Sequence, residues 1–316
     1  MIETINNNLV VVTPVYEDVE ASSKLFKELA AQFGKDVYIV AVDDGSVKQP
    51  LDISAIESAG LHGVVIKLKR NVGHQRAISI GLGYVAEHMS ENQIVVAMDS
   101  DGEDTPASIK ELIRPLEKED VDVVVAQRKS RVETLKFKTF YVIYKFIFHL
   151  LSGKKISFGN FMALKPRAVK RVVNMQELGM HVAGTVLSSK LRIETMPLDR
   201  GPRYAGQSKM NFVGLVLHGF KGLMVFAEDV LVRVGIASAV VAGLSVVGGI
   251  LAVLLKIVGF ATPGWFSIAL GILFLVFLQT GTMTLMMLML TGVVKNKGVE
   301  PHDYETFIDE VIHAKS

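Results

Sequence analysis

Two long uncharged runs near the C-terminus constrain the fold of this 316-residue chain more than any other feature. The first extends from Val234 to Leu255 and the second from Ile257 to Val294, with a Pro-Gly turn at Ala261 to Trp265. Because a helix of about 20 apolar residues crosses a bilayer, each run is long enough to span one. We therefore expect two transmembrane helices within residues 230–294, joined by a tight turn. The alternative is a buried helical hairpin of a soluble protein.

Positive residues flank the two runs on their outer sides. Arg233 precedes the first run, and Lys295 and Lys297 follow the second. The positive-inside rule then places residues 1–210 and the tail 295–316 in the cytoplasm, as parts of a multi-pass protein of the inner (plasma) membrane. Lys256, near the turn, opposes this orientation but can extend its side chain to the interface.

The composition excludes several classes of site. The chain has no cysteine, so it has no disulfide framework, no thiolate metal site and no cysteine nucleophile. Its net charge is only +2, and we expect no nucleic-acid partner. The first residues, MIETINNN, lack the basic and apolar regions of a signal peptide, so we expect no cleaved leader.

The N-terminal half alternates apolar strands with helical stretches. We expect helices at 19–33, 74–89 and 106–116, and strands in the segments LVVVTPVY, DVYIVAVDDGS, GVVIKLKRN, NQIVVAMDSDGED and VDVVVAQR. Continuous apolar strands between helices predict an α/β domain with a mostly parallel sheet covered on both faces. Binding residues of such domains lie beyond the carboxyl ends of the strands.

Three further segments join or follow this domain. Residues 134–155 mix aromatic and basic side chains at helical spacing, which is typical of a helix in the membrane interface; an ordinary amphipathic core helix is the alternative. Residues 211–229 are expected to form a second interfacial helix or linker. The tail after Pro301 is expected to be a short amphipathic helix or a frayed end.

A cluster of carboxylates follows the fourth predicted strand. Asp99, Asp101 and Glu103 lie within one loop and offer hard oxygen ligands. Such oxygens suit Mg²⁺ or Mn²⁺, and Mg²⁺ commonly binds through one or two carboxylates together with substrate phosphates. The alternative is an acidic turn in which Asp104 and Thr105 cap a helix.

A second acidic pair ends the second predicted strand. Asp43 and Asp44 could bind a base or a ribose through carboxylate hydrogen bonds. The alternative is a β-turn around Gly45.

Taken in order, the segments TPVYED, VDDGS, RNVGHQRAISIGLG, MDSDGEDTP and RYAGQSKM resemble family-2 glycosyltransferases of the GT-A type. With the apolar hairpin, the chain is similar, up to about Lys297, to the polyprenyl-phosphate glycosyltransferases related to dolichol-phosphate mannose synthase. The resemblance implies a Rossmann-like GT-A domain over residues 1–210. It also implies inverting transfer of a sugar from a UDP- or GDP-linked donor to polyprenyl phosphate at the cytoplasmic membrane face.

The resemblance carries over residue by residue. It implies that the nucleotide-sugar is bound by Pro14, Tyr16, Asp18, Asp43, Asp44 and Asp99, and the metal by Asp99, Asp101 and Glu103. The implied catalytic residues are Asp101, Arg128, Arg131 and Asn160. The residues implied to contact the lipid phosphate are Arg200, Arg203, Ser208 and Lys209. A solvated basic face, or attraction to anionic lipid, is the alternative for the basic residues. The chain departs from the family in having Tyr16-Glu17-Asp18 for Tyr-Asn-Glu, and Glu103 for the usual Gln.

Asn160 is the sharpest departure, because many relatives have an aspartate there that is a candidate catalytic base. Asn cannot accept a proton in that role. A phosphate monoester has its second pKa at about 6, so its oxygen is largely anionic and needs positioning more than a base. An alcohol acceptor would need the base.

Asn160 therefore favours a phosphate acceptor, which it could orient by hydrogen bonds, or a loss of activity. The two alternatives are a hydroxyl-directed membrane glycosyltransferase and a catalytically silent module that binds nucleotide-sugar. Gly243, Gly248 and Gly249 could pack against a neighbouring helix, so a homo-oligomer is a further expectation.

Overall fold

The computed structural model describes residues 5, 7–128, 135–204, 212–260, 262, 264–295 and 304–314. The chain forms two compact units. The first comprises Met1–Lys138, Ile156–Val225 and Val299–Ser316, and the second comprises Thr139–Lys155 and Phe226–Gly298. The C-terminal tail thus belongs to the first unit, and most of the predicted interfacial segment 134–155 belongs to the second.

The first unit contains a mostly parallel sheet of the strand order β7-β5-β6-β4-β1-β2-β3-β8. Its strands are β1 (Leu9–Val15), β2 (Val37–Asp43), β3 (His62–Leu68), β4 (Ile94–Ala97), β5 (Val123–Arg128), β6 (Met162–Leu164), β7 (Ile193–Leu198) and β8 (Ile308–His313). Strands β4, β1, β2 and β3 run parallel, as do β5 and β7, whereas β6 and β8 pair antiparallel with their neighbours. The five predicted strands and the mostly parallel sheet are confirmed.

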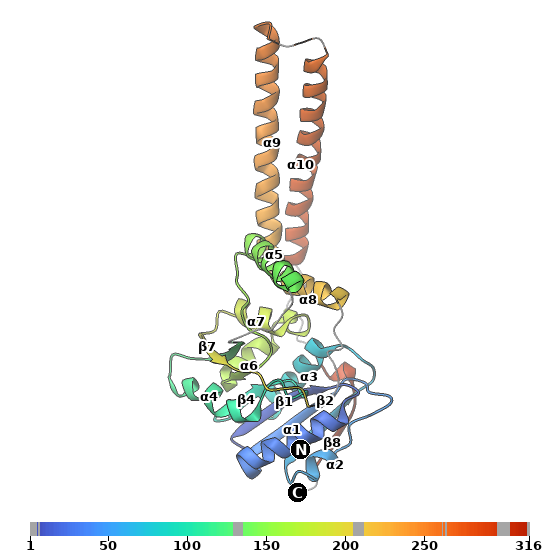
Figure 1. Cartoon of the computed structure of the whole chain (residues 1–316), viewed down its shortest axis with the longest axis vertical. Coiled ribbons are helices and arrows are strands. Elements are labelled where there is room, and N and C mark those ends of the chain that lie inside the picture. The colour runs from blue at the N-terminus through green and yellow to red at the C-terminus, as the bar shows by residue number, and fades with distance from the viewer. Residues whose placement is uncertain are drawn as a thin grey trace. The chain divides into compact units, whose positions relative to one another are not determined.

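Helices cover both faces of the sheet, with α1 and α3 on opposite sides (Figure 1). Val10 and Val12 of β1 pack into the cluster that contains α3, whereas Val11 packs into the cluster that contains α1. Burial of both faces explains why the strands are continuously apolar. The helices of this unit are α1 (Val19–Phe33), α2 (Ser54–Glu57), α3 (His74–His88), α4 (Ile109–Ile113), α6 (Pro166–Val173), α7 (Val182–Ser188) and α8 (Phe212–Met224).

The helix predicted over residues 106–116 is not continuous. A 3₁₀ turn over Pro106–Ser108 leads into α4, and a second 3₁₀ turn follows over Arg114–Glu117. Pro115 lies inside the second turn, and proline has no N–H for an α-helical hydrogen bond and crowds the preceding turn. The prediction of one helix was therefore wrong.

The C-terminal tail is a strand instead of a helix or a frayed end. β8 pairs antiparallel with β3, with Ile66 opposite Val311. The Tyr304 ring lies so close to Gly83 of α3 that a Cβ there would be 2.7 Å from it. The short tail forms a strand because the open edge of β3 supplies backbone partners, which the tail's own pattern does not reveal.

The second unit contains two long apolar helices, α9 (Ala227–Ile257) and α10 (Trp265–Lys295). They form an antiparallel hairpin, because Gly235 faces Met287 and Gly248 faces Leu273. Both are long and apolar enough to cross a membrane, with mean hydropathies of 2.4 and 2.0. Only 17% of the most apolar 18-residue stretch of α9 is buried, and 0% of that of α10. So little burial favours membrane spans over the hairpin of a soluble core.

Helix α5 (Leu135–Ser152) belongs largely to the same unit. Its Phe148 is buried against Phe226, with ring centroids 6.0 Å apart in an edge-to-face arrangement. Val142, Phe146 and Leu150 are exposed. Exposed apolar side chains on a basic helix are typical of the membrane interface, and the interfacial location of this segment stays a prediction.

Candidate functional site

The carboxyl ends of β1, β2, β3 and β4 meet at one edge of the sheet, because these strands are parallel neighbours. The acidic turn after β4 lies at this edge. The Ser100 hydroxyl donates to the Pro14 carbonyl at 3.0 Å and so ties the turn to the end of β1. The edge therefore collects the predicted nucleotide and metal residues.

The acidic turn is closed by its own carboxylates. Asp101 Oδ1 accepts from the Glu103 backbone N–H at 2.9 Å, and Asp104 Oδ2 accepts from the Asp99 N–H at 3.1 Å. Gly102 adopts a φ of 88°, a left-handed conformation that glycine tolerates best. Thr105 makes no side-chain capping bond to the following turn, and Asp104 Oδ2 accepts from the Asp99 N–H.

Two arginines from a distant segment lie against this turn. Arg203 places Nη2 2.9 Å from Asp101 Oδ2 and Nε 3.0 Å from Glu103 Oε1. Arg200 pairs with Glu103 and lies 4.0 Å from Asp104. The structure thus brings together Arg200 and Arg203, predicted to hold a lipid phosphate, with the predicted metal ligands.

Backbone contacts fix the arginine segment in place. The Gly201 N–H donates to the Glu103 carbonyl at 3.0 Å, and the Tyr204 N–H donates to the Asp101 carbonyl at 2.8 Å. Ser208 and Lys209, the other predicted lipid-phosphate residues, lie outside the described part of the chain. Arg131 also lies outside it, and the backbone of Arg128 ends β5.

The two central carboxyls of the turn differ in their electrostatics. Burial and the neighbouring Asp99 charge raise the pKa of Asp101, although Arg203 opposes the shift. Burial opposes ionisation of Asp99, but His74 and the two arginines outweigh it and lower the pKa of that carboxyl. A bound cation would relieve the repulsion between the two carboxylates.

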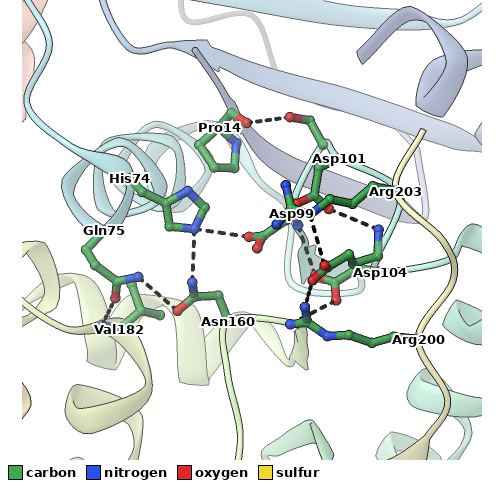
Figure 2. A network of polar contacts seen from close by, with 12 residues as sticks. Pro14, His74, Gln75, Asp99, Asp101, Asp104, Asn160, Val182, Arg200 and Arg203 are labelled. Carbon is green, nitrogen blue, oxygen red and sulfur yellow. Dashed lines mark hydrogen bonds and ion pairs between the residues drawn. The ribbon is translucent and has the colours of Figure 1, made fainter. Parts of the chain in front are cut away.

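His74 and Asn160 lie on the other side of Asp99 (Figure 2). His74 is the first residue of α3, and its Nε2 lies 3.0 Å from Asp99 Oδ1 and 3.0 Å from Asn160 Nδ2. Gln75 Nε2 donates to Asn160 Oδ1 at 3.1 Å, and Gln75 Oε1 accepts from the Val182 N–H at 2.7 Å. The predicted Asn160 is thus connected to the acidic turn.

His74 and Gln75 were not singled out from the sequence, although both stand within RNVGHQRAISIGLG. The available signal was their position, directly after the third strand and at the start of a helix, on the same edge as Asp99. Burial opposes protonation of His74, but the nearby Asp99, Asp104 and Asp101 carboxylates raise its pKa.

The donor set fits a divalent cation held by two carboxylates. Among the described residues no three His, Asp or Glu side chains are grouped to hold a metal. Asp99 Oδ1 is buried and makes no hydrogen bond of acceptable geometry, and Asp101 lies two residues away. Both Glu103 oxygens face arginines. Asp99 and Asp101, with diphosphate oxygens, match the usual manner of Mg²⁺ binding.

Asp43 and Asp44 organise the loops at the ends of β2 and β3. Asp43 accepts from the backbone N–H groups of Ser46 at 3.0 Å and Leu51 at 2.8 Å. Asp44 accepts from those of Val72 at 2.7 Å and Gly73 at 3.0 Å, and its burial raises its pKa. Each carboxylate oxygen keeps a second lone pair for a ligand.

Gly45 bends the chain between these loops, and its N–H donates to the Asp43 carbonyl at 2.8 Å. It has a φ of 69°, and a Cβ there would lie 2.4 Å from the Arg70 backbone.

Glu17 is a further residue at this edge that was not among the predicted site residues. Its carboxylate accepts from the backbone N–H groups of Val47 at 2.8 Å, Lys48 at 3.0 Å and Gln49 at 2.7 Å, and these bonds lower its pKa. Asp18, the predicted acid, stands at the N-cap of α1 without a side-chain capping bond. Tyr16 is 42% exposed at the same strand end.

The model of the family Glycosyl transferase family 2 matches residues 10–169, which is half of the chain and includes the whole acidic turn. The chain belongs to this family. The mostly parallel sheet with its acidic strand end is the GT-A-like fold expected of such an enzyme.

Two curated relatives extend the match beyond the family region. An uncharacterized glycosyltransferase, YkoT of Bacillus subtilis, is 28% identical over 250 residues, which cover 78% of this chain and 72% of the relative. The undecaprenyl-phosphate 4-deoxy-4-formamido-L-arabinose transferase of Klebsiella pneumoniae is 25% identical over 273 residues, which cover 84% of this chain and 81% of the relative.

Among solved structures, a mycobacterial protein superposes on this glycosyltransferase with a TM-score of 0.50 and 15% identity. The match covers 71% of this chain and 75% of that one. At this identity the likeness concerns the fold alone.

Proposed function

We propose that this family-2 glycosyltransferase transfers a sugar from a nucleotide-sugar, with inversion, to polyprenyl phosphate at the cytoplasmic face of the membrane. The observation that carries the proposal is the position of Asn160, whose side chain is linked through His74 to the acidic turn. An amide beside the diphosphate site cannot remove a proton, so it suits an acceptor oxygen that is already anionic. The Klebsiella relative is named for transfer to undecaprenyl phosphate, which supports the same acceptor class.

Asp99 and Asp101 are the residues that would hold Mg²⁺ or Mn²⁺, which neutralises charge on the leaving diphosphate when it is bound. Arg200 and Arg203 lie beside these acids, where incoming phosphate oxygens compete with Glu103 for their guanidinium groups. Pro14, Tyr16, Asp18, Asp43 and Asp44 line the strand ends that would receive the nucleotide.

The reaction itself is a single displacement. The acceptor phosphate oxygen forms the new bond to the anomeric carbon, and the bond from that carbon to the diphosphate breaks on the opposite face. The electron pair leaves with the nucleoside diphosphate. Arg128, Arg131, Ser208 and Lys209 are the further residues proposed to meet phosphate groups.

The membrane assignment is supported by α9 and α10. Their exposed apolar surfaces suit contact with lipid tails, and the basic residues at the outer ends of the hairpin favour a cytoplasmic catalytic unit. Gly248 packs inside the hairpin against Leu273, whereas a Cβ at Gly243 would meet nothing within 4 Å, so Gly243 is the better candidate for contact with a second copy.

The test begins with a screen of UDP- and GDP-sugars for thermal stabilisation of the detergent-solubilised protein with Mn²⁺ or Mg²⁺. The stabilising donor is then radiolabelled and incubated with undecaprenyl phosphate, and transfer of label to the lipid is expected. Nucleotide binding without transfer to lipid phosphate would instead indicate a silent binding module. Transfer to a lipid or sugar hydroxyl would indicate a hydroxyl-directed enzyme.

A further inference from the structure

A chain of polar contacts leads from a backbone amide to the acidic turn. The Val182 N–H at the start of α7 donates to Gln75 Oε1 at 2.7 Å, and Gln75 Nε2 donates to Asn160 Oδ1 at 3.1 Å. Gln75 is only 8% exposed, so these contacts replace its bonds to water. Beyond Asn160 lie His74 and Asp99 (Figure 2).

The contact with the Val182 N–H fixes which way the side-chain amides of Gln75 and Asn160 are oriented. A backbone N–H can only donate, so the Gln75 oxygen faces Val182 and the Gln75 nitrogen faces Asn160. The nitrogen of Gln75 donates in turn, so the oxygen of Asn160 must face it. Asn160 Nδ2 is then directed away from Gln75 toward His74 and the acidic turn.

His74 can satisfy only part of the donor capacity of that amide nitrogen. Its Nε2 lies 3.0 Å from both Asp99 Oδ1 and Asn160 Nδ2. An amide nitrogen carries two N–H groups, and a single ring nitrogen can accept at most one of them. Asn160 therefore keeps at least one N–H for the site, which would be matched by an acceptor that arrives with the substrate.

We propose that Gln75 is a positioning residue that holds Asn160 as a hydrogen-bond donor and thereby selects an acceptor substrate with an anionic oxygen. This inference rests on the proposed function and deepens it, since it assigns the choice of acceptor to the orientation of one amide. Gln75 itself does not touch the substrate.

Two substitutions of Gln75 by side chains of similar size distinguish a role in orienting the Asn160 amide from a role in packing. Gln75→Glu, measured at pH 8, keeps an acceptor for Val182 but presents a second acceptor to Asn160, whose amide then turns its oxygen toward His74. Gln75→Met removes both hydrogen bonds and leaves the Asn160 amide without a fixed orientation. If Gln75 acts by orienting the Asn160 amide, Gln75→Glu is the more damaging change. If Gln75 only supports packing, Gln75→Met is the more damaging change, because it leaves the Val182 N–H unpaired.

The measurement is kcat/KM for undecaprenyl phosphate, together with KM for the nucleotide-sugar and the Tm. We expect Gln75→Glu to lose on the order of 100-fold in kcat/KM, which is the scale of removing one preorganised hydrogen-bond donor. Its KM for the nucleotide-sugar should stay within about threefold of the native value. Gln75→Met should lose about tenfold and show the lower Tm. Gln93→Glu is the matched control, because Gln93 is buried at the opposite end of β4, where it donates to the Ile5 and Asn7 carbonyls.

The outcomes are distinct. If the native protein uses lipid phosphate and Gln75→Met is as damaging as Gln75→Glu, or more so, the inference is overturned and the proposed function stands. An equal loss in Gln93→Glu, per folded molecule, overturns it as well. A native protein that transfers sugar only to hydroxyl acceptors overturns both.

Discussion

Arg203 and Asp101 form an ion pair across the acidic turn, with Nη2 of the arginine 2.9 Å from Oδ2 of the aspartate. The same carboxylate is a proposed metal ligand. If Asp101 holds a divalent cation, the guanidinium of Arg203 would compete with it, and the diphosphate that accompanies the metal would offer Arg203 a new partner.

Replacement of Arg203 should therefore change metal and nucleotide binding in opposite directions. In Arg203→Gln, Mn²⁺ alone should bind about tenfold more tightly, because a positive charge beside the site is removed. The nucleotide-sugar should bind more weakly, because one phosphate partner is lost. Calorimetry with each ligand measures both effects. Arg192→Gln is the control, since Arg192 pairs with Asp122 at the opposite end of β5 at 2.9 Å; weaker Mn²⁺ binding in Arg203→Gln would contradict the competition.

Loss of the Asp101 carboxylate should abolish metal-dependent transfer. We expect Asp101→Asn to lower transfer at least about 100-fold and to remove the thermal stabilisation by Mn²⁺ with nucleotide, because one of two metal-binding carboxylates is lost. Asp36→Asn, an exposed acid that precedes β2 at the far end of the sheet, should change neither. Full activity in Asp101→Asn would refute the metal assignment.

Asn160→Asp should lower turnover by about tenfold, although it introduces the residue that the family resemblance leads one to expect there. A carboxylate accepts the hydrogen bond from Gln75 as Asn160 does, but it presents a second acceptor and a negative charge to an anionic substrate. Steady-state kinetics with undecaprenyl phosphate measures the change. A rise of several orders of magnitude would show that the native protein is not an efficient catalyst.

His181 should make the first unit sensitive to mild acid. Its Nδ1 accepts from the Gly184 N–H at 2.9 Å, and its ring stacks on His218 with centroids 4.5 Å apart. Burial, followed by the proximity of His218, lowers the pKa of His181 to about 4 from 6.5. Below pH 6.5 the unfolded chain takes up a proton that the folded chain refuses, so stability present at neutral pH is lost as the pH falls toward 4.

The matched variant is His181→Asn, whose side-chain oxygen still accepts at the N-cap but does not titrate. Between pH 7.5 and pH 5 the native protein should lose about 2 kcal/mol more stability than the variant. Melting curves of the detergent-solubilised proteins at several pH values measure the difference. Parallel pH dependence of the two proteins would contradict the buried neutral histidine.

Local pattern was enough to predict the central part of the fold and the place of the site. The apolar runs of β1 to β5 identify buried strands, and the acids of the turn from Asp99 to Glu103 follow one of them directly. Parallel strands put their carboxyl ends at one edge, so the sequence was enough to predict that these acids gather there. The apolar hairpin was equally plain, because a membrane span is recognised from length and composition alone.

Contacts between distant segments could not be predicted in the same way. β6 is three residues long and β8 is a short tail, and each is a strand because a neighbouring strand offers backbone partners. Gln75 and Asn160 are hydrogen-bonded although they are 85 residues apart in the sequence, and Arg203 and Glu103 are bonded although they are 100 residues apart. No periodicity encodes such pairs, since they depend on which segments the sheet order brings to one edge.

The sequence by itself thus determined the strands, the apolar hairpin and the edge where the acids gather, because hydrophobic periodicity and composition are local properties of a chain. Only the tertiary structure decided that the predicted phosphate-binding arginines pair with the acidic turn, and that the amide of Asn160 is oriented by Gln75. These are properties of side chains held by separate elements, and their hydrogen-bond direction is defined only when donor and acceptor are both in place.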